Sequence, residues 1–99
     1  MIYEIAIHPA AVAEIASLPR KFQRQIDRRI LHLATNPRPA NAKPLRGRKA
    51  HGLWRLRSGD YRIIYQIQED RLVVLIVRVG HRRDVYRRLP QLPDPPSGG

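Results

Sequence analysis

Residues 53–67 read LWRLRSGDYRIIYQI, and this stretch decides the fold because its side chains alternate with a period of two. Apolar and arginine side chains alternate until the Ser-Gly-Asp segment at 58–60. A period of two begins again after this segment. Glycine and aspartate are turn-forming residues, and they separate the two halves as a hairpin turn does. The stretch therefore predicts an antiparallel hairpin of strands 53–57 and 61–67.

The turn at 58–60 sets the predicted register of this hairpin. With a three-residue turn, strict pairing places Arg62 on the face of Leu56 and Arg55 on the opposite face. A β-bulge at Gly59 would change that arrangement, and glycine favours a bulge at such a turn. The sequence leaves the choice between these two arrangements open.

The chain before the hairpin predicts one strand and two helices. The β-branched and aromatic residues of 2–7 favour a strand. Apolar residues then recur every three or four positions, which predicts helices over 9–18 and 19–35, with Pro19 ending one and starting the other. Residues 36–51 contain three prolines and few apolar side chains, so we expect a loop.

The chain after the hairpin predicts one more strand. Residues 72–79 (LVVLIVRV) are apolar at nearly every position, as in a strand that is central or covered on both faces. Residues 81–89 form a short helix or an ordered loop. Residues 90–99 contain four prolines and two glycines, so we expect a flexible tail after a domain of residues 1–89. The order β-α-α-β-β-β predicts an α+β fold, with a helical hairpin packed on a small, mostly antiparallel sheet.

The composition excludes several classes of protein. The 99 residues suffice for one domain with one core. The absence of cysteine excludes disulfides, thiolate metal sites and a cysteine nucleophile. The four histidines lack metal-ligand spacing, so we expect no metal and no cofactor. No apolar run approaches the roughly 20 residues of a membrane span, and no signal-peptide pattern is present, so we expect a cytoplasmic protein without a membrane partner.

The charge indicates a polyanionic partner. The chain has 19 Lys and Arg against 8 Asp and Glu, a formal net charge of +11. Nucleic acid is the usual partner of so basic a small chain. Arginine forks bind phosphate and stabilise the charge that develops in phosphoryl transfer. RNA supplies its own nucleophile, the 2′-OH, and His81 and Tyr86 could exchange the protons. The residues alone leave RNA cleavage and plain nucleic-acid binding both open.

Two segments resemble the RelE branch of the RelE/ParE toxin superfamily. They are L-W-R-L-R-S-G-D-Y-R-I-I-Y at 53–65 and V-R-V-G-H-R-R-D-V-Y-R at 77–87, and their combination is specific. The resemblance extends over about residues 2–88 and includes K-P-L-R-G at 43–47. It implies a toxin that enters the ribosomal A site and cuts the codon there by 2′-OH attack, without a metal.

The resemblance also implies roles for individual residues. Arg55 and Arg82 are expected to hold the scissile phosphate, and Arg62 to stabilise the transition state. Tyr86 stacks on a base or exchanges a proton, and His81 suits a general acid or base. RNA and rRNA binding is expected from further basic residues: Lys43, Arg46, Arg48, Lys49, Arg57, Arg83, Arg87 and Arg88.

One position departs from the family pattern and one assignment has an alternative. Some members carry a lysine, a candidate general base, where this chain has Leu53. His81, Lys49 or His51 could take that role instead. The alternative for Arg62 is a structural salt bridge to an aspartate, with Asp84 or Asp60 as the partner.

The implied partners are a cognate antitoxin, the ribosome and mRNA, and a toxin–antitoxin heterotetramer is one assembly compatible with them. Two other functions are considered. A ParE-like inhibitor of DNA gyrase would have the same fold and no nuclease site, and the H-R-R-D-V-Y segment argues against it. A non-catalytic toxin homologue would bind nucleic acid only.

Overall fold

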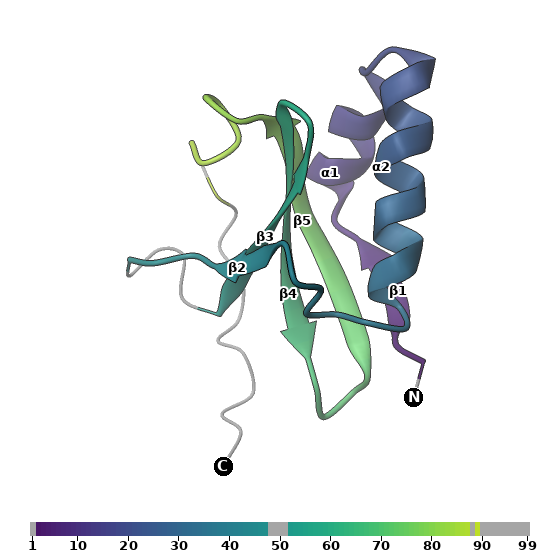
Figure 1. The fold of residues 1–99 in the computed structure, drawn as a ribbon, viewed down its shortest axis with the longest axis vertical. Coiled ribbons are helices and arrows are strands. Elements are labelled where there is room, and N and C mark those ends of the chain that lie inside the picture. Colours follow the sequence, from purple (N-terminus) through teal and green to yellow (C-terminus); the bar gives the residue numbers. More distant parts are fainter. Residues whose placement is uncertain (1, 48–51, 88, 90–99) are drawn as a thin grey trace.

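The computed structural model describes residues 2–47, 52–87 and 89. These residues form one five-stranded sheet in the order β1-β5-β4-β3-β2, with both helices on one side of it (Figure 1). The predicted α+β fold is confirmed, with one additional strand. The elements are β1 Glu4–Ile7, α1 Pro9–Ala16, α2 Arg20–Leu33, β2 Ala42–Pro44, β3 Leu53–Ser58, β4 Tyr61–Gln68 and β5 Val73–His81.

The helices form where the sequence periodicity predicts them. His8 caps α1, because its Nδ1 accepts a hydrogen bond from the Ala10 N–H at 3.1 Å, and Pro9 occupies the first helical position. The apolar stripe of α2 is buried at Ile26, Ile30 and Leu33 and packs against the sheet. Neither helix in the described residues is long and apolar enough to cross a membrane.

The sheet is mostly antiparallel, as predicted. Only β1 runs parallel, alongside β5, and the other neighbours pair antiparallel. The central strand β4 is buried from Arg62 to Ile67. The apolar β5 lies between β1 and β4, which explains why its sequence is apolar at nearly every position.

The loop expected over 36–51 contains the short strand β2. Three residues with a proline are too few for a period-two signal, so the sequence pattern missed it. Pro44 lies opposite Trp54, and the next residue, Leu45, donates its N–H to the Leu53 carbonyl at 2.8 Å. Farther back, the Tyr65 hydroxyl donates to the Pro37 carbonyl at 2.8 Å and anchors the chain that leads into β2.

The predicted hairpin register is wrong by one residue. The turn between β3 and β4 has two residues instead of three, so that Arg57 pairs with Arg62. Gly59 has φ of +59°, and a glycine with positive φ at the first central position is typical of a tight two-residue turn. Arg62 therefore shares a face with Arg55, and no bulge at Gly59 is needed to bring them together.

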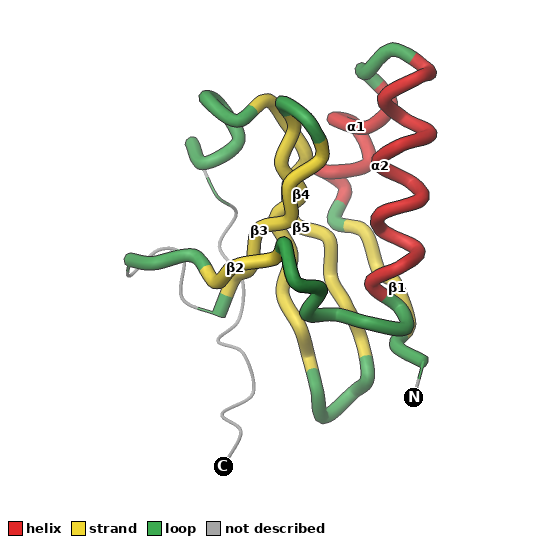
Figure 2. Tube along the Cα trace, viewed as in Figure 1, coloured by secondary structure: helices red, strands yellow, loops and turns green. Residues whose placement is uncertain are grey.

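Residues 82–87 form consecutive turns and no helix, so the ordered-loop alternative is the correct one (Figure 2). Val85 is buried and fixes the loop against Leu53, Ile64 and Val77, on the sheet face opposite the helices. The predictions for Arg48, Lys49, His51, Arg88 and the tail 90–99 lie outside the described residues.

Candidate functional site

Three predicted site arginines lie together on the sheet face opposite the helices. Arg57 and Arg62 are direct cross-strand partners, and Arg55 is two residues from Arg57 on β3. Side chains paired in this way have Cβ atoms about 5 Å apart, and like charges so close repel each other. In the described part of the chain none of the three forms an ion pair. This group, which we call the arginine face, therefore favours binding of an anion.

Arg62 is held by the backbone of its own hairpin. Its side chain is buried, and its Nη1 donates to the carbonyls of Gly59 at 2.8 Å and Tyr61 at 2.9 Å. The other two guanidinium nitrogens, Nε and Nη2, have no hydrogen-bond partner among the described residues. Because every buried side-chain polar atom in those residues has a partner, Nε and Nη2 remain in contact with solvent. Neither Asp60 nor Asp84 forms a salt bridge with Arg62 among the described residues. The guanidinium is thus fixed in place without being neutralised.

The same hairpin turn fixes the backbone at Arg82. The Arg82 N–H donates to the Asp60 carbonyl at 2.8 Å, while the Arg82 side chain is exposed. One two-residue turn therefore positions both Arg62 and the start of the 82–87 loop.

A groove beside the arginine face collects four of the predicted residues. It has a volume of about 710 Å³ and is lined by Ala42, Lys43, Pro44, Leu45, Arg46, Arg55 and Tyr86. We call it the β2 groove, because β2 and the residues after it form one wall. Tyr86 reaches it from the 82–87 loop, which buried Val85 anchors. A phosphate bound to Arg55 would thus lie in the same groove as Tyr86.

The structure does not place His81 with these residues. His81 pairs with Tyr61, and their ring centroids are 6.3 Å apart in an edge-on arrangement on the helix side of the sheet. Its Nδ1 accepts a hydrogen bond from the Arg83 N–H at 3.3 Å, which helps to shape the loop. Arg83 and Arg87 are exposed, and Arg87 lies 3.9 Å from the Asp84 carboxylate.

Arg78, which belongs to the V-R-V-G-H-R-R-D-V-Y-R segment, has a structural role. Its Nη2 and Nε donate to the Glu14 carboxylate at 2.7–3.0 Å, and the Val79 N–H donates to the same carboxylate at 3.1 Å. The hydrogen bond with Glu14 raises the pKa of the Arg78 guanidinium. This pair ties α1 to β5 and keeps Arg78 out of the candidate site.

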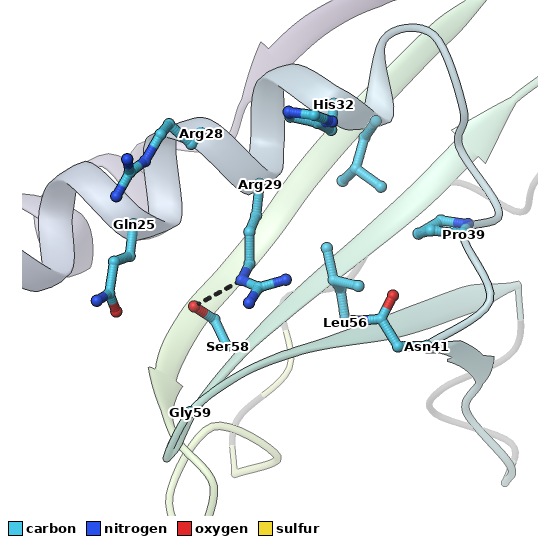
Figure 3. Close-up of a pocket in the computed structure, with 10 residues that line it drawn as sticks. Gln25, Arg28, Arg29, His32, Pro39, Asn41, Leu56, Ser58 and Gly59 are labelled. Atoms are coloured by element: carbon cyan, nitrogen blue, oxygen red, sulfur yellow. Dashed lines mark hydrogen bonds between the residues drawn. The ribbon is translucent and has the colours of Figure 1, made fainter.

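A second basic groove was not found from the sequence. It lies between α2 and the end of β3, has a volume of about 540 Å³ and contains Arg28, Arg29 and His32 (Figure 3). We call it the α2 groove. The spacing of Arg28, Arg29 and His32 could have indicated this groove, because residues three and four positions apart lie on the same face of a helix. No cluster of metal-ligating side chains occurs in the described residues.

Comparisons with known proteins show the family to which the chain belongs. Residues 5–86 match the family described as the ParE toxin of type II toxin–antitoxin systems. The mRNA interferase toxin RelE of Escherichia coli K12 is 30% identical over 88 residues, which are 87% of this chain and 92% of that protein. Toxin RelG of Mycobacterium tuberculosis is 48% identical over 46 residues, or 46% of this chain and 52% of RelG.

A solved structure has the same fold. The toxin–antitoxin complex RelBE2 of Mycobacterium tuberculosis superposes with a TM-score of 0.74 and 29% identity, covering 83% of this chain and 100% of the matched chain.

Proposed function

The chain belongs to the ParE toxin family of type II toxin–antitoxin systems, and on that premise we propose that it is an endoribonuclease that cuts mRNA in the ribosomal A site. It resembles RelE toxins in sequence and in fold. In this role it acts in the cytoplasm, its substrate is translated mRNA and its partner is a cognate antitoxin.

The observation that carries the proposal is the arginine face. Arg55, Arg57 and Arg62 share one side of the hairpin without a carboxylate to neutralise them in the described residues. A phosphodiester gains negative charge as a fifth oxygen bonds to phosphorus, and preorganised cations stabilise that charge. Arg62 is preorganised, because two carbonyls already hold its Nη1.

The proposed reaction needs no atom from outside the RNA. The 2′-oxygen bonds to phosphorus, and the bond from phosphorus to the 5′-oxygen of the next nucleotide breaks. The products are a 2′,3′-cyclic phosphate and a 5′-OH. The proton of the 2′-OH must reach an acceptor, and the departing 5′-oxygen must receive a proton.

Tyr86 is the group we assign to proton exchange. Among the described residues that line the β2 groove, Tyr86 alone has a side-chain group that can both donate and accept a hydrogen bond, whereas Lys43, Arg46 and Arg55 only donate. His81 lies on the other side of the sheet, so its assignment as acid or base stays a prediction. The position of Leu53, where some family members have lysine, is buried in this chain.

Exposed cations, including Arg57 of the arginine face, would also dock the toxin on rRNA. Lys43, Arg46, Arg57, Arg83 and Arg87 are exposed, and such contacts release counterions from nucleic acid. Docking should therefore weaken as salt rises, while the chemistry at the arginine face should depend on geometry.

The test is to map RNA ends by primer extension after a short pulse of toxin expression. We expect cuts in codon phase in translated messages and none in the same message with its start codon removed. Growth arrest with intact messages would contradict the proposal. Growth arrest with new DNA breaks and intact RNA would instead indicate the gyrase-inhibitor alternative.

A further inference from the structure

His81, the last residue of β5, accepts three hydrogen bonds from the loop that follows it. Its carbonyl accepts the N–H groups of Asp84 at 2.9 Å and Val85 at 3.0 Å. Its imidazole Nδ1 accepts the Arg83 N–H at 3.3 Å. The three bonds close one turn, which ends at the buried Val85 and lies directly before Tyr86.

The same arrangement begins α1. The carbonyl of His8 accepts the N–H groups of Ala11 at 2.9 Å and Val12 at 3.0 Å, and its Nδ1 accepts the Ala10 N–H at 3.1 Å. An N-cap side chain satisfies a backbone N–H in this way at the start of a helix, where no earlier carbonyl can accept it. His81 is therefore the N-cap of a single turn, as His8 is the N-cap of a helix.

The imidazole of His81 is held in the orientation that this bond needs. Its ring lies edge-on to the Tyr61 ring, and Tyr61 packs on Phe22 of α2 with ring centroids 5.1 Å apart. Because Nδ1 accepts a hydrogen bond, it carries no proton, and the proton of the neutral ring lies on Nε2. The cap therefore uses one form of the side chain, the Nε2–H tautomer.

The capped turn connects two residues of the candidate site. Arg82 begins it, with its N–H on the Asp60 carbonyl at 2.8 Å, and Tyr86 follows it and lines the β2 groove. His81 is not among the described residues that line this groove. The imidazole can therefore act on the chemistry through the position of Tyr86, without touching the substrate.

We propose that His81 is a positioning residue, whose imidazole caps the turn that holds Tyr86 at the β2 groove. Its effect on cleavage rests on the proposed function, whereas the cap itself does not. Loss of the cap leaves the Arg83 N–H without its acceptor and loosens the turn, so that Tyr86 reaches the groove in a smaller fraction of molecules. The cleavage rate then falls by that fraction, while ribosome affinity changes little.

The test replaces His81 with three side chains that differ as acceptors. Asparagine is a preferred N-cap residue and presents an amide oxygen near the position of Nδ1, glutamine presents its amide near Nε2, and alanine has no acceptor. The measurement is single-turnover cleavage on programmed ribosomes. We expect His81→Asn to keep the rate within about threefold of wild type, and His81→Gln and His81→Ala to lose about tenfold.

His8→Ala is the matched control, because it removes the same kind of cap from α1. It should lower the thermal unfolding temperature and leave the cleavage rate within about twofold, since α1 and the arginine face lie on opposite sides of the sheet. Hydrogen exchange of the Arg83 amide, followed by NMR on the isolated protein, tests the cap without RNA. Exchange should be about tenfold faster in His81→Ala than in wild type or His81→Asn.

Three results would overturn the inference. A loss of about 100-fold or more in all three His81 variants would indicate proton transfer by the imidazole. Rates near wild type in all three would show that the site does not need the cap. An equal loss of rate in His8→Ala would show an effect of stability alone.

Two further arms keep the comparison decisive. If His81→Ala does not fold, His81→Gln against His81→Asn gives the same comparison. Absence of cleavage by the wild-type protein would contradict the proposed function, and exchange of the Arg83 amide would still decide whether His81 caps the turn.

Discussion

The β2 groove and the α2 groove are both basic, and they differ in what accompanies the charge. The β2 groove adjoins three arginines on one sheet face and contains a tyrosine hydroxyl. The α2 groove takes Arg28, Arg29 and His32 from one face of α2. The first arrangement suits charge development and proton transfer, whereas the second, with two arginines from one helix, suits binding of an anion. Positive charge alone therefore does not identify a catalytic site in this chain.

The sharpest test of this difference is the removal of one arginine from each region. Arg62→Ala should reduce the cleavage rate about 10³-fold, because it removes a preorganised donor to the transition state. Arg28→Ala should leave the rate within about twofold, since Arg28 lies on the other side of the sheet. The measurement is single-turnover cleavage on programmed ribosomes. Similar losses in both variants would remove the distinction between the grooves.

Tyr86→Phe separates the two roles that the family resemblance allows for this residue. The phenyl ring can still stack on a base, but the hydroxyl is gone. Because we assign proton exchange to the hydroxyl, we expect a loss of about 10²-fold in the cleavage rate at unchanged ribosome affinity. A rate within threefold of wild type, with Tyr86→Ala strongly impaired, would assign Tyr86 to stacking instead.

Gly59→Val tests whether the hairpin turn positions the site. Valine strains a backbone with φ of +59°, and a Cβ there would meet no atom within 4 Å, so the effect acts through the backbone. The turn carbonyls hold Arg62 and the Arg82 N–H. We expect about a tenfold lower cleavage rate, a free-energy change of about 1.4 kcal/mol, with little change in ribosome affinity.

Gly47→Val is the matched control for that strain. Gly47 has φ of +105° and equally open surroundings. It should lose similar stability and less activity, as judged by thermal unfolding and the single-turnover rate. An equal loss of activity in both glycine variants would mean that strain alone explains the Gly59 result.

Glu14→Gln should change stability without changing chemistry. The Glu14 carboxylate accepts hydrogen bonds from Arg78 and the Val79 N–H. Its loss should lower the free energy of unfolding by about 2 kcal/mol, because hydrogen bonds to charged groups contribute about that much. Denaturant unfolding measures the change. Reduced cleavage by a fully folded Glu14→Gln protein would show that Arg78 belongs to the site after all.

The strongly periodic parts of the fold could be predicted from the sequence. Both helices and the hairpin follow from repeats of 3.6 and 2 residues, and β5 follows from its continuous run of apolar residues. The strand β2 could not be predicted, because Ala42–Pro44 is too short for periodicity and is fixed by tertiary contacts such as the Tyr65 hydroxyl to Pro37.

Motifs in the sequence predict which residues belong to the candidate site, and this assignment stays a prediction, but the motifs do not give the geometry of the site. The identities of Arg55, Arg62 and Tyr86 follow from motifs, but their grouping depends on a two-residue turn where three were expected. A one-residue change of register moves a side chain to the other face. The sequence likewise could not show that Arg78 is held by Glu14, 64 positions away along the chain.

In the proposed reaction the RNA supplies the nucleophile and the arginine face stabilises its attack. The most direct measurement uses a short message whose A-site codon carries a single 2′-deoxynucleotide at the cleaved position, bound to ribosomes with the purified toxin. We predict that the all-ribose message is cut to a 2′,3′-cyclic phosphate and that the 2′-deoxy message stays intact. Cleavage of both messages at similar rates would contradict 2′-OH attack.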